Sequence, residues 1–375
     1  MQCNGSAIRR PVQAGADKKA APGTGTATAG ETGNESLIRY TQVVPKQNYY
    51  GLILAGGRGT RFWPRSRRAK AKQVLSFFGE RTLIQQTVER LSAVLPPERI
   101  WIITNDLLRD EIIRQLPEVP KKQILAEPAQ RNTAPCIALA AHIIQSIDRD
   151  AVMGVFPADH IITKPARYAK LLKPAYQSAA QGNIAVLGIE PRWAETGYGY
   201  IEFGKAFTPG KLQPVVSFRE KPVAATAKKF VAAKRFYWNA GMFFWKTSVL
   251  LEAMRDFQPK TWTLLAALPP FSSPKFRESM ARTFPLCENI SIDYAVLEKA
   301  KNVVGIPAAD IGWNDVGSWD AVYELLNRDA EANASVSQSL TLDSTEIILT
   351  PKASSLRCWA SRPDYCRYSR CTAHR

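Results

Sequence analysis

Short apolar segments alternate with helix-length segments between residues 49 and 156, and this alternation constrains the fold more than any other feature. Apolar runs at Tyr49–Leu54, Ile100–Ile103, Ile124–Ala126 and Ala151–Phe156 predict strands. Helices are predicted between them, at Thr82–Leu95, Leu107–Leu116 and Thr133–Ile147. This order indicates a largely parallel sheet covered by helices on both faces. Ligands of such α/β sheets bind beyond the carboxyl ends of the strands.

The first strand runs into a glycine-rich turn, Gly56–Arg61, which is followed by basic residues up to Lys72. Glycines there let backbone N–H groups approach phosphate oxygens closely. The turn is not a Walker loop, because no Gly-Lys-Ser/Thr follows it, and it lacks the dinucleotide fingerprint, because Phe62 replaces the third glycine. Arg61 can bind the phosphate at which charge develops. The turn therefore predicts a site for a phosphate-rich ligand, with a plain glycine-rich turn as the alternative.

The formal net charge of +17 is compatible with nucleic-acid binding, but its distribution argues against it. Residues 1–47 carry a net charge of +3 and residues 351–375 a net charge of +5, and the densest internal cluster adjoins the glycine turn. No apolar run approaches the ~20 residues of a membrane span and no secretory signal is evident, so a cytoplasmic location is expected. Three histidines and six cysteines without CxxC spacing argue against zinc.

Composition divides the chain into three parts. Residues 1–47 are expected to be a disordered extension or the product of an upstream mis-start, because they cannot bury enough apolar surface to offset the entropy of ordering. Residues 48–328 form the expected main domain. Residues 329–375 are expected to be a short β-rich segment that is truncated or frameshifted. A DNA string that encodes the strand-like sequence VAVLGIE in one reading frame encodes Leu356–Arg362 when it is read from its second base.

The middle of the chain predicts further elements in a less regular order. Strands are expected at Ile184–Gly188, Tyr198–Phe203, Val215–Phe218, Tyr237–Trp245 and Val303–Pro307. Helices are expected at Pro222–Ala233, Ser291–Lys299 and Asp320–Leu326.

The glycine turn and seven further segments, all in the same order, resemble the sugar nucleotidyltransferases. The segments are Glu127–Pro135, Phe156–His160, Gly197–Glu202, Phe218–Pro222, Trp238–Phe243, Ser291–Tyr294 and Trp313–Trp319. Within that family, Arg-Asn-Thr-Ala-Pro and Trp-Asn-Asp-Val-Gly-Ser-Trp are similar to the mannose-1-phosphate guanylyltransferase branch. The resemblance covers about residues 49–328. It implies a Rossmann-like (GT-A-like) α/β nucleotidyltransferase domain with a mixed, mostly parallel sheet, followed by a short β-rich piece.

The resemblance implies transfer of GMP from GTP to α-D-mannose 1-phosphate, which yields GDP-mannose and diphosphate. The sugar phosphate would attack the α-phosphorus in line. Because the attacking phosphate is already an anion, no general base is required, and cations, a metal ion and positioning would supply the catalysis. The implied partners are the two substrates, without nucleic acid or membrane, and a homodimer is left open. The alternatives are another hexose-1-phosphate nucleotidyltransferase and a non-catalytic protein that binds sugar nucleotides.

The resemblance also implies roles for individual residues. Arg61 and Lys72 would be catalytic, and Asp159 and Asp315 would hold Mg²⁺. The nucleotide would be bound by Leu54, Ala55, Gly56, Gly57, Gly59, Thr60, Glu127, Asn132 and Thr133. The sugar phosphate would be bound by Gly199, Glu220, Lys221 and Asn239.

Local sequence leaves structural alternatives open for several of these positions. Asp159 and Asp315 have the context of turn residues, Thr133 could simply cap a helix, and Glu220-Lys221 could be a solvated ion pair. Two histidines are given no catalytic role: His142 is expected to pack within an apolar helix and His160 to support the Asp159 loop.

Overall fold

The computed structural model describes residues 48–57, 60–63, 65–330, 332–335, 347–352 and 355–360. All of them belong to one compact unit, Gln42–Arg375. The extension expected at residues 1–47 and residues 361–375 of the expected frameshifted tail lie outside the described residues. In the part of the chain that the structure describes, no helix is long and apolar enough to cross a membrane.

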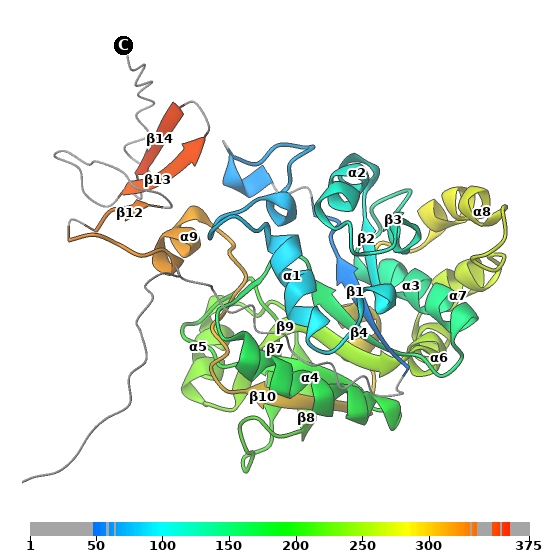
Figure 1. The fold of residues 1–375 in the computed structure, drawn as a ribbon. Helices are drawn as coiled ribbons and strands as arrows, with labels where there is room; N and C mark the ends of the chain where they lie inside the picture. Colours follow the sequence, from blue (N-terminus) through cyan, green and yellow to red (C-terminus); the bar gives the residue numbers. More distant parts are fainter. Residues whose placement is uncertain are drawn as a thin grey trace, which may run out of the picture. The chain divides into compact units, whose positions relative to one another are not determined.

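A nine-stranded mixed sheet lies at the centre of the fold, in the order β3-β2-β1-β4-β9-β6-β10-β8-β7 (Figure 1). Its strands are β1 (Tyr49–Leu54), β2 (Ile100–Thr104), β3 (Ile124–Ala126), β4 (Val152–Pro157), β6 (Ile184–Ile189), β7 (Tyr200–Phe203), β8 (Gln213–Arg219), β9 (Phe236–Lys246) and β10 (Val303–Ala308). Strands β1 to β4 form parallel pairs, as their alternation with helices predicts. Strand β9 runs antiparallel to β4 and β6. The predicted α/β class with a mixed sheet is confirmed.

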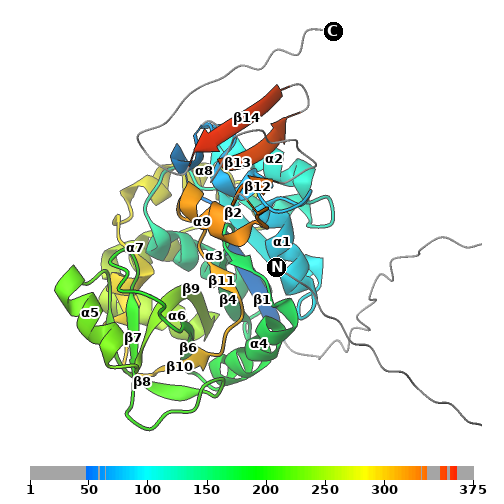
Figure 2. The same ribbon diagram turned by 90° about the vertical axis from the view of Figure 1, so that its left-hand side faces the viewer.

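Strand β1 is buried on both faces because its side chains alternate between two apolar clusters. Ile53 packs with helices α1 (Leu83–Ser92), α2 (Asp106–Gln115) and α4 (Pro165–Ala180). Leu52 packs on the opposite face, whose helices are α3 (Thr133–Ile147), α6 (Thr247–Phe257), α7 (Pro259–Ala266) and α8 (Phe276–Thr283). Figures 1 and 2 show these helices on the two sides of the sheet. The carboxyl ends of β1 and β4, where the predicted phosphate and metal residues follow, therefore lie on adjacent parallel strands.

Two local predictions differ from the structure. Thr133 does not cap α3: Asn132 is the cap, and its Oδ1 accepts from the Thr133 N–H at 2.9 Å. The Thr133 hydroxyl instead accepts from the Ile292 N–H at 2.8 Å, so it is engaged in a tertiary contact. The helix predicted at Ser291–Lys299 is a π-helix at Asp293–Leu297, before which the Ser291 hydroxyl accepts from the Tyr294 N–H at 3.5 Å.

A small antiparallel pair carries the last predicted motif to the site. Strand β5 (Ile161–Ile162), just after Asp159, pairs with β11 (Trp313–Asn314), just before Asp315. Helix α9 (Trp319–Leu325) follows, and the Ser318 hydroxyl accepts from the Ala321 N–H at 3.3 Å to cap it. A third apolar cluster includes Phe62, Phe77, Val316 and Val322, and it joins the basic loop to this region.

The C-terminal region forms a separate three-stranded sheet of β12 (Ala334–Ser335), β13 (Ile347–Lys352) and β14 (Ser355–Ala360). Strands β13 and β14 are antiparallel. A β-rich segment was expected here, although β14 falls where the sequence shows no recognisable pattern. The truncated or frameshifted origin of the segment stays a hypothesis.

Strand β4 contains a glycine whose missing side chain is structurally required. A Cβ atom on Gly154 would lie 2.5 Å from the Tyr176 hydroxyl oxygen and 2.8 Å from Phe156 Cζ. The Tyr176 hydroxyl donates to the Tyr50 carbonyl at 2.8 Å and is fully buried, so it cannot move away freely. We predict that Gly154→Ala lowers the free energy of unfolding by about 1–3 kcal/mol through overpacking.

Urea unfolding of the protein checks this prediction. Gly204→Ala is the matched control, because a Cβ there meets open space. Equal stability of the two variants would contradict the account of the packing around Gly154.

Candidate active site

Two cavities collect most of the predicted site residues. The first has a volume of about 720 Å³, and its lining includes Leu54, Gly56, Gly57, Glu127, Asn132 and Thr133 from the predicted nucleotide set. The second has a volume of about 510 Å³, and its lining includes Arg61, Lys221 and Asp315. The glycine turn thus contributes to both, since Gly57 lines the first cavity and Arg61 the second.

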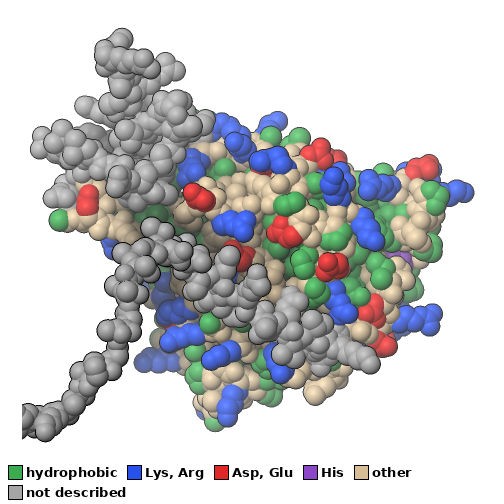
Figure 3. All heavy atoms as spheres, in the orientation of Figure 1, with side chains coloured by type: hydrophobic (Ala, Val, Ile, Leu, Met, Phe, Trp, Pro, Cys, Tyr) green, Lys and Arg blue, Asp and Glu red, His purple; other side chains and the backbone are tan. Residues whose placement is uncertain are grey.

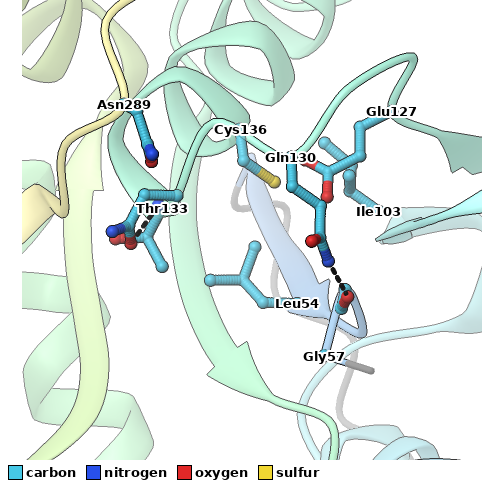
Figure 4. A pocket seen from close by; sticks show the side chains of 10 residues that line it. Leu54, Gly57, Ile103, Glu127, Gln130, Thr133, Cys136 and Asn289 are labelled. Carbon is cyan, nitrogen blue, oxygen red and sulfur yellow. Dashed lines mark hydrogen bonds between the residues drawn. The ribbon is translucent and has the colours of Figure 1, made fainter. Parts of the chain in front are cut away.

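The first cavity has apolar and polar walls (Figure 4). Thr133 and Asn289 lie on one side, Glu127 and Gln130 on the other, and Leu54 lies between them. Glu127 is 9% exposed, and this burial raises the pKa of its carboxyl to about 7. An ionised carboxylate here can accept two hydrogen bonds from a ligand that presents adjacent N–H donors.

The carbonyl groups of the glycine turn point toward the protein. The Gln73 side-chain amide donates to the Ala55 carbonyl at 2.7 Å and to the Gly57 carbonyl at 3.2 Å. The Asn105 and Gln130 amides donate to the Gly56 carbonyl at 3.3 and 3.1 Å. In a trans peptide the N–H points opposite to the C=O, so the N–H groups of Gly56 and Gly57 face away from these side chains. Within the described residues neither N–H donates to another backbone group.

The remaining residues of the turn have different surroundings. Gly59 lies outside the described residues, and Thr60 begins a short 3₁₀ helix, η1 (Thr60–Phe62). Arg61 is exposed, whereas the next residue, Phe62, is fully buried. The Phe62 ring packs 4.8 Å from Phe77 and 5.4 Å from Trp319, measured between centroids, so it anchors the turn beside Arg61.

Lys72 joins the two predicted metal ligands. It begins a second short 3₁₀ helix, η2 (Lys72–Val74), and is 8% exposed. Its ammonium lies 3.0 Å from Asp159 Oδ2 and donates to the Asp315 backbone carbonyl. Burial alone would raise the pKa of Asp159, but Lys72 and His160 outweigh it and the net shift is downward. The structure therefore brings together Lys72, Asp159 and Asp315, three predicted site residues from distant segments of the chain.

This donor set is suited to a magnesium ion. Mg²⁺ is bound by one or two carboxylates together with substrate phosphates and water. The Asp159 carboxylate lies beside the Lys72 ammonium, and the backbone carbonyl of Asp315 accepts from the same ammonium, so two aspartates are positioned at one junction. Within the described residues no group of three or more His, Cys, Asp or Glu side chains could hold a metal ion alone. Phosphate oxygens and water would have to complete the coordination.

The predicted sugar-phosphate residues form a single cluster. The Asn239 N–H donates to the Gly199 carbonyl at 2.8 Å, and a side chain on Gly199 would collide with the Glu220 carboxylate. The Lys221 ammonium lies 2.9 Å from Glu220 Oε1. The sequence alternative of a solvated pair fits Glu220 poorly, because its side chain is only 8% exposed.

Several residues of the site were missed from the sequence. In the first cavity these are Ile103, Gln130, Cys136 and Asn289. In the second they include Arg192, Trp193, Glu195, Tyr198, Trp313 and Ser318. Tyr198, Trp313 and Ser318 occur within the quoted motifs, which could have indicated them, whereas no motif covers Arg192, Trp193 and Glu195.

Charge on the face visible in Figure 3 does not form one basic patch. Lys and Arg side chains are scattered over this face and interspersed with Asp and Glu. This distribution favours a local anion site over an extended nucleic-acid surface.

The two predicted non-catalytic histidines lie in different places. His142 is half-buried on α3 and lines neither cavity. His160 Nδ1 accepts from the Trp313 indole N–H at 3.2 Å, and its backbone carbonyl accepts from Arg90 at 3.0 Å. Its role as a support for the Asp159 loop stays a prediction.

His160 should remain neutral well below neutral pH. Burial lowers the pKa of its imidazole to about 4, so between about pH 4 and the unfolded value of about 6.5 only the unfolded chain is protonated there. The contribution of His160 to stability should fall as the pH drops through this window. NMR titration of the ring, with a His160→Gln variant for assignment, checks the midpoint; a midpoint near 6.5 would contradict the buried geometry.

Comparison with known proteins agrees with this geometry. A nucleotidyl transferase family model matches residues 50–332. The mannose-1-phosphate guanylyltransferase of Salmonella muenchen is 37% identical over 288 residues, which cover 75% of this chain and 60% of that protein. A putative mannose-1-phosphate guanylyltransferase of Vibrio cholerae serotype O1 is 39% identical over 287 residues, 75% of this chain and 61% of its own length. The chain thus spans about 60% of the length of these curated relatives.

A solved structure supports the same relationship. The crystal structure of "mannose-1-phosphate geranyltransferase" from Thermus thermophilus superposes with a TM-score of 0.71 at 27% identity, covering 84% of this chain and 95% of that one. Because the family model and the fold agree over the whole region that holds the site, the chain belongs to the nucleotidyl transferase family.

Proposed function

We propose that this protein transfers GMP from GTP to α-D-mannose 1-phosphate and releases GDP-mannose and diphosphate. One observation carries the proposal: Arg61 and Lys221 line one polar cavity with Asp315, whose backbone carbonyl accepts from the buried Lys72 ammonium beside Asp159. The printed names of the Salmonella and Vibrio relatives support the choice of substrates.

The first cavity suits the base and its ribose. Leu54 and Ile103 offer apolar surface to a purine ring. Guanine presents N1–H and N2–H side by side, and the Glu127 carboxylate can accept both. Adenine presents an N6–H donor beside an acceptor at N1, so one carboxylate oxygen would face a lone pair and stay unpaired. Buried unpaired charge is costly, which makes Glu127 the proposed source of selectivity.

The phosphate chain would follow the glycine turn from the first cavity to the second. The Gly56 N–H would bind a phosphate oxygen, since it points opposite to the Ala55 carbonyl that Gln73 holds, and Arg61 and Lys72 would supply cations farther along. Asp159 and Asp315 would hold Mg²⁺, which when bound neutralises phosphate charge and acts as a Lewis acid.

The attacking group is the anionic phosphate of the sugar, so positioning replaces proton abstraction. We propose that Lys221 binds this phosphate while Glu220 and Asn239 accept from and donate to the sugar hydroxyls. Arg61 would bind the oxygens of the α-phosphate, where charge accumulates as the new bond forms. Because Lys221 and Asp315 line the same cavity, the phosphate of the sugar would lie near the junction of Asp315 with Lys72.

Some attributes of the protein remain predictions. The identity of the ion as Mg²⁺ rests on the donor set, and the cytoplasmic location rests on the sequence. A homodimer is left open.

Pyrophosphate release with each of the four nucleoside triphosphates, mannose 1-phosphate and Mg²⁺ tests the proposal. We expect clear preference for GTP over ATP. Glu127→Gln should reduce that preference by about tenfold or more, because an amide cannot accept both guanine donors without a clash of like groups. Glu118→Gln, at an exposed position shortly before β3, is the matched control. A wild-type preference for UTP or dTTP would overturn the guanylyl assignment.

A further inference from the structure

The segment Asn289–Asp293, here called the strap, touches both halves of the site. At its start, Asn289 lines the first cavity. The next residues are bonded to the first turn of α3, beside that cavity: the Ala134 N–H donates to the Ile290 carbonyl at 3.1 Å, and the Ile292 N–H donates to the Thr133 hydroxyl at 2.8 Å. The strap is therefore bonded directly to the wall of the proposed nucleotide cavity.

At its other end the strap reaches the sugar-phosphate cluster. The Asn239 amide nitrogen donates to Asp293 Oδ1 at 2.9 Å, and Asn239 Oδ1 accepts from the Gly241 N–H at 3.0 Å. Both ends of the Asn239 amide are thus fixed, so one N–H of the amide keeps a defined direction for a ligand. Asp293 makes this bond from a different part of the chain, 54 residues away.

The backbone at this point is unusual. Asp293 is the first residue of the π-helix Asp293–Leu297, and π-helical turns are rare and frequently found at functional sites. Ile292, which precedes Asp293, is fully buried, so the strap has little freedom to shift independently. A rigid connection between two subsites can transmit the ordering of one to the other.

We infer that Asp293 is a positioning residue for the sugar phosphate, and that the strap couples its binding to binding of the nucleotide. The inference rests on the proposed function for the identity of the two ligands. Asp293 acts through Asn239, and Thr133 connects the strap to the nucleotide side. Ordering of the first turn of α3 by a nucleotide would hold the strap, and hence Asn239, in the geometry that binds the sugar phosphate.

Steady-state kinetics separate this role from a general structural one. Asp293→Ala should raise KM for mannose 1-phosphate about tenfold, the scale expected when a bonded amide loses its partner, and should leave the Kd of GTP, measured without mannose 1-phosphate, nearly unchanged. Asp293→Asn keeps an acceptor oxygen and should restore KM to within about threefold of wild type. Asp256→Ala is the control, because Asp256 is exposed and pairs only with its neighbour Arg255 among the described residues. A weaker Kd of GTP without mannose 1-phosphate, or no rescue by asparagine, would overturn the positioning role.

Direct binding tests the coupling without turnover. Calorimetry measures the Kd of mannose 1-phosphate alone and with saturating guanosine 5′-(α,β-methylene)triphosphate, which cannot release diphosphate. We expect the analogue to tighten binding in the wild type, and Asp293→Ala and Thr133→Val to bring the ratio of the two Kd values close to one. An unchanged ratio in both variants, or a ratio of one in the wild type, would overturn the coupling. A wild type that binds neither ligand would instead overturn the proposed function.

Discussion

The buried ammonium of Lys72 is the interaction on which the rest of the site depends. A lysine that is 8% exposed must be paired, because an unpaired charge at such a position is strongly destabilising. Its partners, the Asp159 carboxylate and the Asp315 carbonyl, follow two different strands. Parallel pairing of β1 with β4 brings Asp159 beside the glycine turn, and pairing of β5 with β11 brings Asp315 beside Asp159. The topology of the sheet thus assembles one charged junction at this edge.

The two cavities divide the chemistry between them. The first supplies a partly apolar chamber with one perturbed carboxylate, Glu127, and suits a heterocyclic base. The second is lined by cations and carboxylates and suits phosphate and a polyol. The glycine turn spans both, and among its described residues the Ala55 and Gly56 carbonyls are held by Gln73 and Asn105, so the adjoining N–H groups point away from these two side chains. Preorganised donors of this kind lower the barrier to phosphoryl transfer, because they need not reorganise as charge develops.

Sequence reasoning reached the parallel half of the sheet, because its strands are short, apolar and separated by amphipathic helices. It missed α4, because Pro174 inside that helix is normally a helix breaker. It also missed α6 to α8, which follow the long aromatic strand β9 and whose ends have no clear start or stop signals in the sequence. It assigned the Thr133 hydroxyl to a helix cap, although a contact with Ile292 from 159 residues away takes it instead. Asp293 was visible only as part of a motif, because its partner Asn239 is distant in the chain. Contacts of this kind are decided by tertiary packing and are not encoded in local pattern.

The central claim is that Asp159 and Asp315 act as one unit at the Lys72 junction to support nucleotidyl transfer. Pyrophosphate release from GTP and mannose 1-phosphate with Mg²⁺ tests it most directly in the wild type, Asp159→Asn, Asp315→Asn and the double variant. Residues that act as a unit give non-additive losses, so the account predicts that each single variant loses at least about 100-fold in kcat and that the double variant loses little more. Independent, multiplicative losses, or single variants with wild-type turnover, would contradict it.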